Sequence, residues 1–236
     1  MKYFFVGLMV VVVLLSAAFQ LSRSRDFQVF GELVSRVETT DKVIALTFDD
    51  GPVPVFTDKI IAALAAEQVP ATFFLMGQNI EWHRQEVNKL IAAGHQIGNH
   101  SYSHPRMVLM SYQSVVDEVS KTNQLIRSLG YDKEILFRPP YGKKLLALPF
   151  YLWREGITTV TWDVEPESFP EIASSSEKIT QHVIDNARPG SIILLHVMYA
   201  SRQASMDAVP SIIRGLKAQG YRFVTLDYLL AKSGRI

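Results

Sequence analysis

Two adjacent aspartates, Asp49 and Asp50, end an apolar run and are followed at once by Gly51 and Pro52 in the stretch ALTFDDGPVP. Successive side chains at the end of a strand point in different directions, so the two carboxylates can have different roles. One can bind a metal ion while the other accepts a proton from a water molecule on that ion. Asp-Gly-Pro is also a common turn sequence, so this stretch alone does not establish a site.

Two histidines, His100 and His104, lie four residues apart in HSYSH and are followed by Pro105. Side chains at this spacing can reach one ion if the residues between them form a turn of helix. With one of the aspartates they make a two-histidine, one-carboxylate set, which leaves coordination positions open for water and substrate. Open positions indicate catalysis. The ligand types favour Zn²⁺, with Co²⁺, Ni²⁺, Mn²⁺ and Fe²⁺ as alternatives.

The elements that must position these residues follow from the hydrophobic pattern beyond Asp41, where short apolar runs alternate with helical patterns. The runs predict strands over 43–48, 71–75, 95–99, 136–138, 158–162, 191–196 and 223–225. Helices are expected over 56–68, 79–93, 111–129, 144–155, 176–187 and 206–219. Seven strands joined by helices predict a closed or nearly closed parallel barrel, with its chemistry at the carboxyl ends of the strands.

Polar residues do follow several of these strands. Arg138, Trp162, Asp163 and His196 stand at strand ends, as do the aspartates and His100. Each residue alone has an ordinary structural explanation, since a lone histidine after a strand is usually a hydrogen-bonded core residue. Their common position at one rim favours a single site.

The N-terminus predicts export. A charge-free segment runs from Tyr3 to Phe19, which is near the lower limit for a membrane-spanning helix. Residues 1–22 are expected to be a signal peptide, cleaved near Ala18, or a membrane anchor; residues 23–40 a linker or lead-in; and residues 41–236 the functional domain. We expect the protein to be secreted or periplasmic after cleavage, or anchored to the membrane and facing the cell envelope.

The amino-acid composition limits the kinds of molecule that the protein is expected to bind. Lysine plus arginine number 24 against 23 aspartates plus glutamates, so no positive field indicates nucleic acid. The absence of cysteine excludes disulfides, thiolate metal sites and cysteine nucleophiles. No feature implies a protein partner, and a neutral or carbohydrate-like ligand fits better.

Four motifs together carry a family resemblance: TFDDGP, HSYSH, RPPYG at 138–142, and SIILLH ending at His196. In this order they resemble the polysaccharide deacetylases of carbohydrate esterase family 4, the NodB-homology domain, over residues from about 41 to 230. The resemblance implies an α/β fold, a distorted (β/α)7 barrel, here preceded by an apolar N-terminal helix. It also implies metal-dependent removal of N-acetyl groups from an amino-sugar polymer such as peptidoglycan, a chitin-like glycan or an exopolysaccharide.

By motif position, the resemblance implies a role for each polar residue. Asp49 would be the general base, and Asp50, His100 and His104 the metal ligands. Arg138 would orient Asp49, because its planar guanidinium suits a carboxylate.

The remaining motif residues would meet the substrate. The backbone N–H of Tyr141 would stabilise the oxyanion that forms at the acetyl carbonyl. Leu194 would line the pocket for the acetyl methyl group, and Trp162 is also expected at the substrate site. His196 would be the general acid that protonates the departing amine.

One motif departs from the family pattern. Where the family commonly has Asp-x-x-Asp-Trp, residues 165–169 read EPESF. Ser168 replaces the second aspartate, which in the family supports the catalytic histidine, and Phe169 replaces the tryptophan. Asp163 or Glu165 could support His196 instead, or the acidic stretch could be a solvated loop.

Two other functions stay open on the sequence. A barrel that binds carbohydrate without catalysis would keep the fold and the aromatic residues, but the intact base, ligands and acid argue against it. A related amidase acting on small cyclic amides would share the barrel, but such enzymes are normally cytoplasmic and the apolar N-terminus disfavours this alternative.

Overall fold

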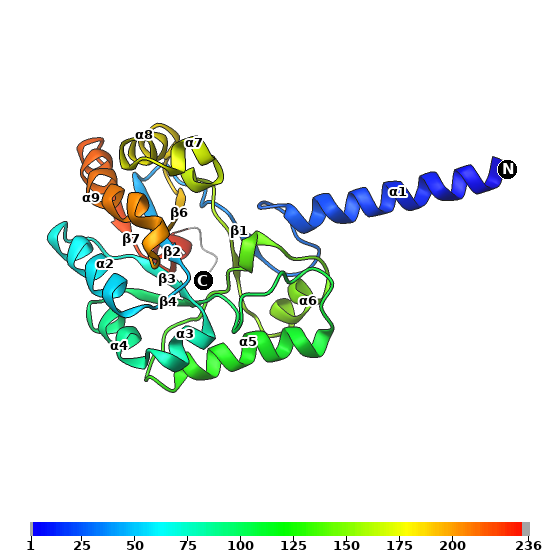
Figure 1. Ribbon diagram of the computed structural model, residues 1–236, viewed down its shortest axis with the longest axis horizontal. Helices are drawn as coiled ribbons and strands as arrows, with labels where there is room; N and C mark the ends of the chain where they lie inside the picture. Colours follow the sequence, from blue (N-terminus) through cyan, green and yellow to red (C-terminus); the bar gives the residue numbers. More distant parts are fainter. Residues whose placement is uncertain (1, 233–236) are drawn as a thin grey trace.

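The computed structural model describes residues 2–232. Figure 1 shows strands in the middle of the body with helices around them, and one helix, α1 (Lys2–Arg23), standing away from the body. Among the described residues, α1 is the one helix that is long and apolar enough to cross a membrane, and none of its apolar window is buried.

The strands form a parallel arrangement around β2. They are β1 (Leu33–Val34), β2 (Val43–Asp49), β3 (Thr72–Leu75), β4 (Gln96–Asn99), β5 (Thr159–Val160), β6 (Ile192–His196) and β7 (Arg222–Val224). β2 pairs with β3, β6 and β7, while β4 pairs with β3 and β1 with β5, all in parallel. Single parallel bridges, 99 to 137, 137 to 159 and 164 to 193, continue the ring from β4 to β6. The predicted α/β barrel is therefore present, with a distorted wall where the strand predicted over 136–138 is reduced to bridges at Phe137 and the one predicted over 158–162 to the two residues of β5.

Helices connect the strands and cover them from outside. They are α2 (Pro54–Ala66), α3 (Gly77–Trp82), α4 (Arg84–Ala92), α5 (Tyr112–Arg127), α6 (Ala147–Arg154), α7 (Pro170–Ala173), α8 (Ser176–Asn186), α9 (Gln203–Ala218) and α10 (Leu226–Ala231). The helix expected over 79–93 is two helices, because His83 leaves the helical region with φ −132° and ψ 46°. Short 3-10 turns, η1 (Pro140–Gly142), η2 (Pro166–Ser168) and η3 (Ala200–Arg202), lie between the longer elements.

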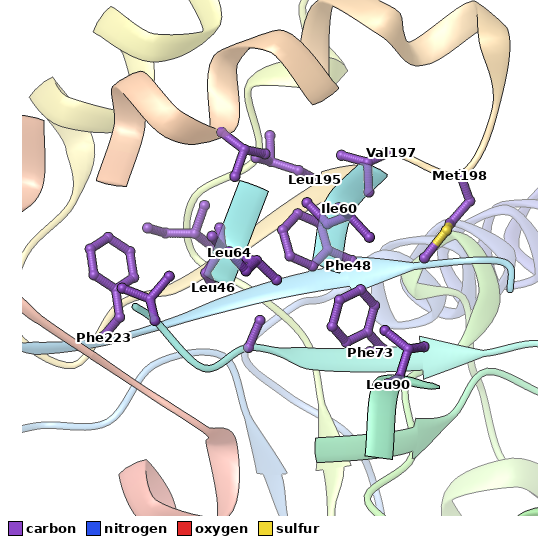
Figure 2. Packing of buried hydrophobic residues seen from close by; sticks show 14 of the residues in the cluster. Leu46, Phe48, Ile60, Leu64, Phe73, Leu90, Leu195, Val197, Met198 and Phe223 are labelled. Carbon is purple, nitrogen blue, oxygen red and sulfur yellow. The ribbon is translucent and has the colours of Figure 1, made fainter. Parts of the chain in front are cut away.

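β2 is buried over its whole length, as expected for a parallel strand covered on both faces. Ile44, Leu46 and Phe48 belong to the core shared with the surrounding helices. Figure 2 shows Leu46 and Phe48 packed among these helix and strand side chains, and the Phe48 ring centroid lies 5.1 Å from that of Phe73. Since side chains alternate along a strand, Asp49 shares the opposite, inward face, so the buried apolar residues fix its direction.

Residues 23–40, expected as a linker or lead-in, lie against the barrel. Val34 and Val37 are buried, and β1 within this segment pairs with β5. The Thr159 N–H also donates to the Glu32 carbonyl at 3.1 Å. The segment therefore completes part of the barrel wall.

Candidate active site

The two aspartates diverge at a strained turn. Asp49 ends β2 in the extended conformation, whereas Asp50 has φ 70° and Gly51 has φ 72°. A positive φ is uncommon for a non-glycine residue. A Cβ on residue 51 would lie 2.6 Å from Cγ of Met198, so the turn needs glycine there. The turn directs the neighbouring carboxylates to different positions, as the sequence predicts.

The segment from His100 to His104 is a bent loop. The predicted turn of helix is wrong, because Ser101 has φ 65° and His104 has φ 61°. Side-chain bonds hold these conformations: Asn99 Oδ1 accepts from the Ser101 N–H at 2.8 Å, and Ser101 Oγ accepts from the His104 N–H at 3.0 Å. The loop nevertheless brings both imidazoles to one place.

A glutamate that the sequence did not single out fastens this loop. Glu118, on α5, accepts from the N–H groups of Tyr102 and Ser103, each at 2.8 Å, and from Ser103 Oγ at 2.6 Å. Three bonds from consecutive loop residues to one carboxylate restrict the path of the chain between the two histidines.

Asp50, His100 and His104 lie close enough to share one ion, because one ligand atom from each lies within 4.8 Å of the others. Asp50 Oδ1 is 3.5 Å from His104 Nε2 and 3.9 Å from His100 Nε2. Two ligands ~2.1 Å from a tetrahedral ion lie ~3.4 Å apart. Asp50 Oδ1 is also buried without a hydrogen-bond partner in the described chain, which is costly unless a cation is present.

The surroundings of both histidines suit metal binding. His100 Nδ1 lies 2.8 Å from the Arg138 carbonyl, so Nδ1 donates there and Nε2 is left to bind an ion. For His104, burial lowers the pKa, which favours the neutral ring. The residues present therefore fit a divalent metal.

Asp49 is held by a buried arginine. Arg138 Nη1 donates to Asp49 Oδ1 at 2.7 Å and to Thr47 Oγ1 at 2.8 Å, and Nη2 donates to the Thr161 carbonyl at 3.0 Å. The other oxygen, Asp49 Oδ2, lies 3.6 Å from His100 Nε2. Burial alone would raise the pKa of Asp49, but the charges of Arg138, His100 and His196 lower it overall. Asp49 is therefore an ionised carboxylate beside the metal-ligand cluster.

His196 ends β6 directly opposite Asp49 in the β2–β6 register. Its Nδ1 is hydrogen-bonded to Glu167, which also accepts from the His196 backbone N–H at 3.1 Å and from Ser205 Oγ. Burial lowers the pKa of His196, but the bond to Glu167 and the charge of Glu167 raise it to about 9. The imidazolium, 21% exposed against 2% for its partner, faces the pocket with a proton available at neutral pH.

The two carboxylates expected to support His196, those of Asp163 and Glu165, have other partners in the structure. Asp163 accepts from Ser191 Oγ and the Ile192 N–H, each at 2.8 Å. Glu165 Oε2 accepts from Trp162 Nε1 at 2.9 Å and from Ser168 Oγ at 2.7 Å. The prediction that either carboxylate supports His196 is wrong.

Glu167 has this position because η2 turns the chain. The turn aims residue 167 at the ring and leaves Glu165 beside Trp162. The one available signal was a glutamate immediately before Ser168, whose longer side chain can reach from the neighbouring position.

These side chains line one pocket of about 340 Å³. Its wall includes the predicted residues Asp49, Asp50, His100, His104, Tyr141, Trp162, Leu194 and His196, together with Arg25, Glu165, Ser168 and Arg202. Arg138 lies behind the wall, where it reaches Asp49. Tyr141, at φ 58°, places its ring 4.6 Å from that of His104. Sequence reasoning missed Arg25 and Arg202 because neither lies in a motif.

Several known proteins resemble this chain in fold and in sequence. Residues 36–160 match the family model described as polysaccharide deacetylase. A peptidoglycan-N-acetylglucosamine deacetylase of Bacillus cereus is 38% identical over 80% of this chain and 69% of its own length. The chain belongs to the polysaccharide deacetylase family.

Two further relatives agree. The peptidoglycan-N-acetylmuramic acid deacetylase PdaC of Bacillus subtilis is 33% identical over 82% of this chain, which spans 40% of that protein. A solved peptidoglycan N-acetylglucosamine deacetylase, in complex with 4-naphthalen-1-yl-N-oxidanyl-benzamide, has 36% identity and a TM-score of 0.78, covering 84% of this chain and 92% of its own. The predicted fold and enzyme class, a hydrolase that removes N-acetyl groups from amino-sugar polymers, are confirmed.

Proposed function

We propose that this deacetylase acts on the amino sugars of peptidoglycan, outside the cytoplasmic membrane, with a divalent ion held by Asp50, His100 and His104. One observation carries the proposal. The unpaired Asp50 oxygen faces two imidazole nitrogens, and an ionised Asp49 and a protonated His196 line the same pocket. Zn²⁺ is our first choice, with Co²⁺, Ni²⁺, Mn²⁺ and Fe²⁺ compatible with the same ligands.

The reaction needs a base, an acid and a site for developing negative charge. When bound, the metal would activate a water molecule and polarise the acetyl carbonyl. Asp49, oriented by Arg138, accepts the proton of the attacking water. The Tyr141 backbone N–H is proposed to donate to the carbonyl oxygen as it becomes negative.

The departing group is an amine and must leave protonated. As the bond from the acetyl carbon to nitrogen breaks, His196 donates its Nε2 proton to that nitrogen, while Glu167 on Nδ1 stabilises the charged ring before transfer. Water thus supplies the second oxygen of acetate and, through the enzyme, the proton on the amine. Leu194 and Trp162 are proposed to hold the acetyl group and the sugar.

The names of the relatives support the choice of peptidoglycan. Both N-acetylglucosamine and N-acetylmuramic acid deacetylases are among them. We propose that the substrate is one of these sugars within a glycan strand, because Arg25, Glu165 and Arg202 add polar side chains to the pocket wall beyond the residues assigned to the reaction.

Acetate release from a panel of glycans tests this proposal. Purified protein, freed of metal and reloaded with Zn²⁺, should release acetate from peptidoglycan strands faster than from chitin oligomers or acetylated xylan. Binding without acetate release would identify a non-catalytic carbohydrate-binding barrel, and ring-opening of a cyclic imide would identify the alternative amidase. The Asp49→Asn variant controls for acetate released by contaminants.

The location is a separate proposal. The apolar α1 and the cell-wall substrates named for the relatives support export, either with α1 kept as a membrane anchor or with cleavage near Ala18. Protease added to intact spheroplasts should digest the barrel, whereas protection would contradict export. The mass of the mature N-terminus distinguishes the anchored from the cleaved form.

A further inference from the structure

The chain that leaves α1 is fastened to the barrel. The Ser22 carbonyl accepts from the Lys144 N–H at 3.2 Å, and the Ser24 carbonyl accepts from Lys144 Nζ. The Arg25 carbonyl accepts from Thr161 Oγ1 at 2.6 Å. Lys144 is only 1% exposed, so its ammonium depends on this contact. Residues 22–25, here called the joint, are therefore held against the barrel at the base of α1.

This joint lies beside the active-site pocket. Arg25 lines the pocket and pairs with Glu165 at 2.7 Å, with its guanidinium 4.9 Å from the Trp162 ring centroid. α1 ends at Arg23, two residues earlier, so the Arg25 Cα lies within ~8 Å of the last helical Cα. A membrane that contains α1 would therefore lie next to the mouth of the pocket.

Three cations gather around the same joint. Arg23 and Lys143 lie 5.2 Å and 5.8 Å from the ring centroid of Phe19, and Arg106 lies 4.8 Å from that of Tyr141. Burial and the charges of Arg23 and Arg106 lower the pKa of Lys143, so Lys143 lies within electrostatic range of both arginines. Within residues 2–232, none of the three forms a salt bridge with a carboxylate. Such a cluster favours an external anion.

Exposed apolar side chains accompany the cations. Leu109 is 89% exposed and Leu146 is 53% exposed. Met107 pairs with Lys144 in a parallel bridge. Leu109 and Leu146 each follow one of these residues by two positions, so the segments that carry the leucines leave the bridge in the same direction. Basic residues with exposed leucines are typical of surfaces that lie in the headgroup region of a bilayer.

We propose that Arg23, Arg106, Lys143, Leu109 and Leu146, here called the basal surface, bind anionic phospholipid headgroups and hold the pocket mouth at the membrane surface. Each basic residue near an anionic bilayer adds ~1 kcal/mol, about fivefold in the equilibrium for contact. The proposal rests on membrane insertion of α1 and does not depend on the reaction. If deacetylation holds as well, the substrate is glycan within reach of the membrane.

Lipid contact can be measured on the full chain in vesicles. The chain has no cysteine, so Leu109→Cys gives a single fluorophore site, and Lys133→Cys, beyond the far end of α5, gives a matched control. The vesicles are phosphatidylcholine with or without phosphatidylglycerol, and they carry a headgroup quencher. We expect the Leu109→Cys label to be quenched more strongly with phosphatidylglycerol, and the Lys133→Cys label to be quenched weakly in both.

Charge dependence gives two further readouts. Arg106→Glu combined with Lys143→Glu should reduce the quenching of the label to its level in phosphatidylcholine, while Lys133→Glu combined with Arg154→Glu should leave it unchanged. In 1 M salt, where the screening length is ~3 Å, the extra quenching of the Leu109→Cys label should disappear while Arg23, Arg106 and Lys143 are all kept. Equal quenching in both lipids, or salt-independent quenching, would overturn the proposal.

Acetate release by the unsubstituted chain is followed in the same vesicles. If acetate is released but lipid contact is absent, the lipid-binding role of the basal surface is rejected and the proposed function stands. Lipid contact without acetate release would reject the proposed function and leave the basal surface standing.

Discussion

Replacing Glu167 by glutamine removes the charge that keeps His196 protonated while preserving the shape of the side chain. The rise in the pKa of His196 from 6.5 to about 9 corresponds to ~3 kcal/mol in favour of the imidazolium. Without the carboxylate, the pKa should fall to 6.5 or below, because burial favours the neutral ring. With a pKa of 6.5, the protonated fraction at pH 8 drops ~30-fold, whereas at pH 6 it changes less than ~2-fold; a lower pKa would enlarge both losses and keep the one at pH 8 larger.

The assay is kcat/KM for acetate release between pH 5.5 and 10 with metal-loaded enzyme. If His196 is the acid, Glu167→Gln should move the alkaline limb downward, with a large loss at pH 8 and almost none at pH 6. Glu165→Gln is the matched control, because Glu165 contacts Trp162 and Ser168, and its limb should stay in place. An equal loss at pH 6 and pH 8, or an unmoved limb, would refute this role for Glu167.

Three further outcomes follow from the same contacts. Asp49→Asn should keep the metal but lose ~10² to 10⁴-fold in rate, whereas Asp50→Asn should also lose metal affinity, measured by chelator competition. Glu118→Gln should weaken metal binding ~10 to 100-fold by loosening the histidine loop, measured in the same way. The pair of Glu167 and His196 stabilises the fold fully below pH ~6.5 and loses this as pH rises through about 9, so the free energy of unfolding lost in Glu167→Gln, ~3 kcal/mol at pH 6, should shrink by pH 10.

Each of these outcomes has a clear contrary result. Equal metal loss in both aspartate variants would reject the separation of base from ligand. Unchanged metal affinity in Glu118→Gln would leave Glu118 as a purely structural contact, and Asp117→Asn, one residue earlier on α5, controls for damage to the helix. A stability difference that stays constant with pH would mean that His196 is not charged through Glu167.

Most of the barrel could be predicted because buried parallel strands leave a strong signal. β2 reads as a continuous apolar run that ends in two aspartates, and its seven buried residues match that pattern. His100 directly follows β4, and β6 ends at His196. Two predicted strands shrink to a bridge at Phe137 and the short β5, since apolar composition reports burial and not hydrogen-bond pairing.

The parts that could not be predicted depend on local backbone conformation. No repeating pattern of residues predicts the positive φ values that bend the His100 to His104 loop. The same is true of the turn that directs Glu167 toward His196. The family motif places its supporting aspartate at position 168, which is serine here. The carboxylate that contacts His196 belongs to the preceding residue, Glu167. Arg25 reaches the pocket through long-range packing of a segment outside the motifs, which a reading of neighbouring residues does not reveal.

The most direct test of the metal site is a metal titration of the apoprotein with acetate release followed at each step. With N-acetylglucosamine oligomers as substrate, acetate release should rise in proportion to bound Zn²⁺ and stop rising at one ion per chain. Under the same conditions Asp50→Asn should show neither tight binding nor acetate release. Full acetate release by metal-free protein, or saturation unaffected in Asp50→Asn, would contradict the assignment of Asp50, His100 and His104 as the metal site of this deacetylase.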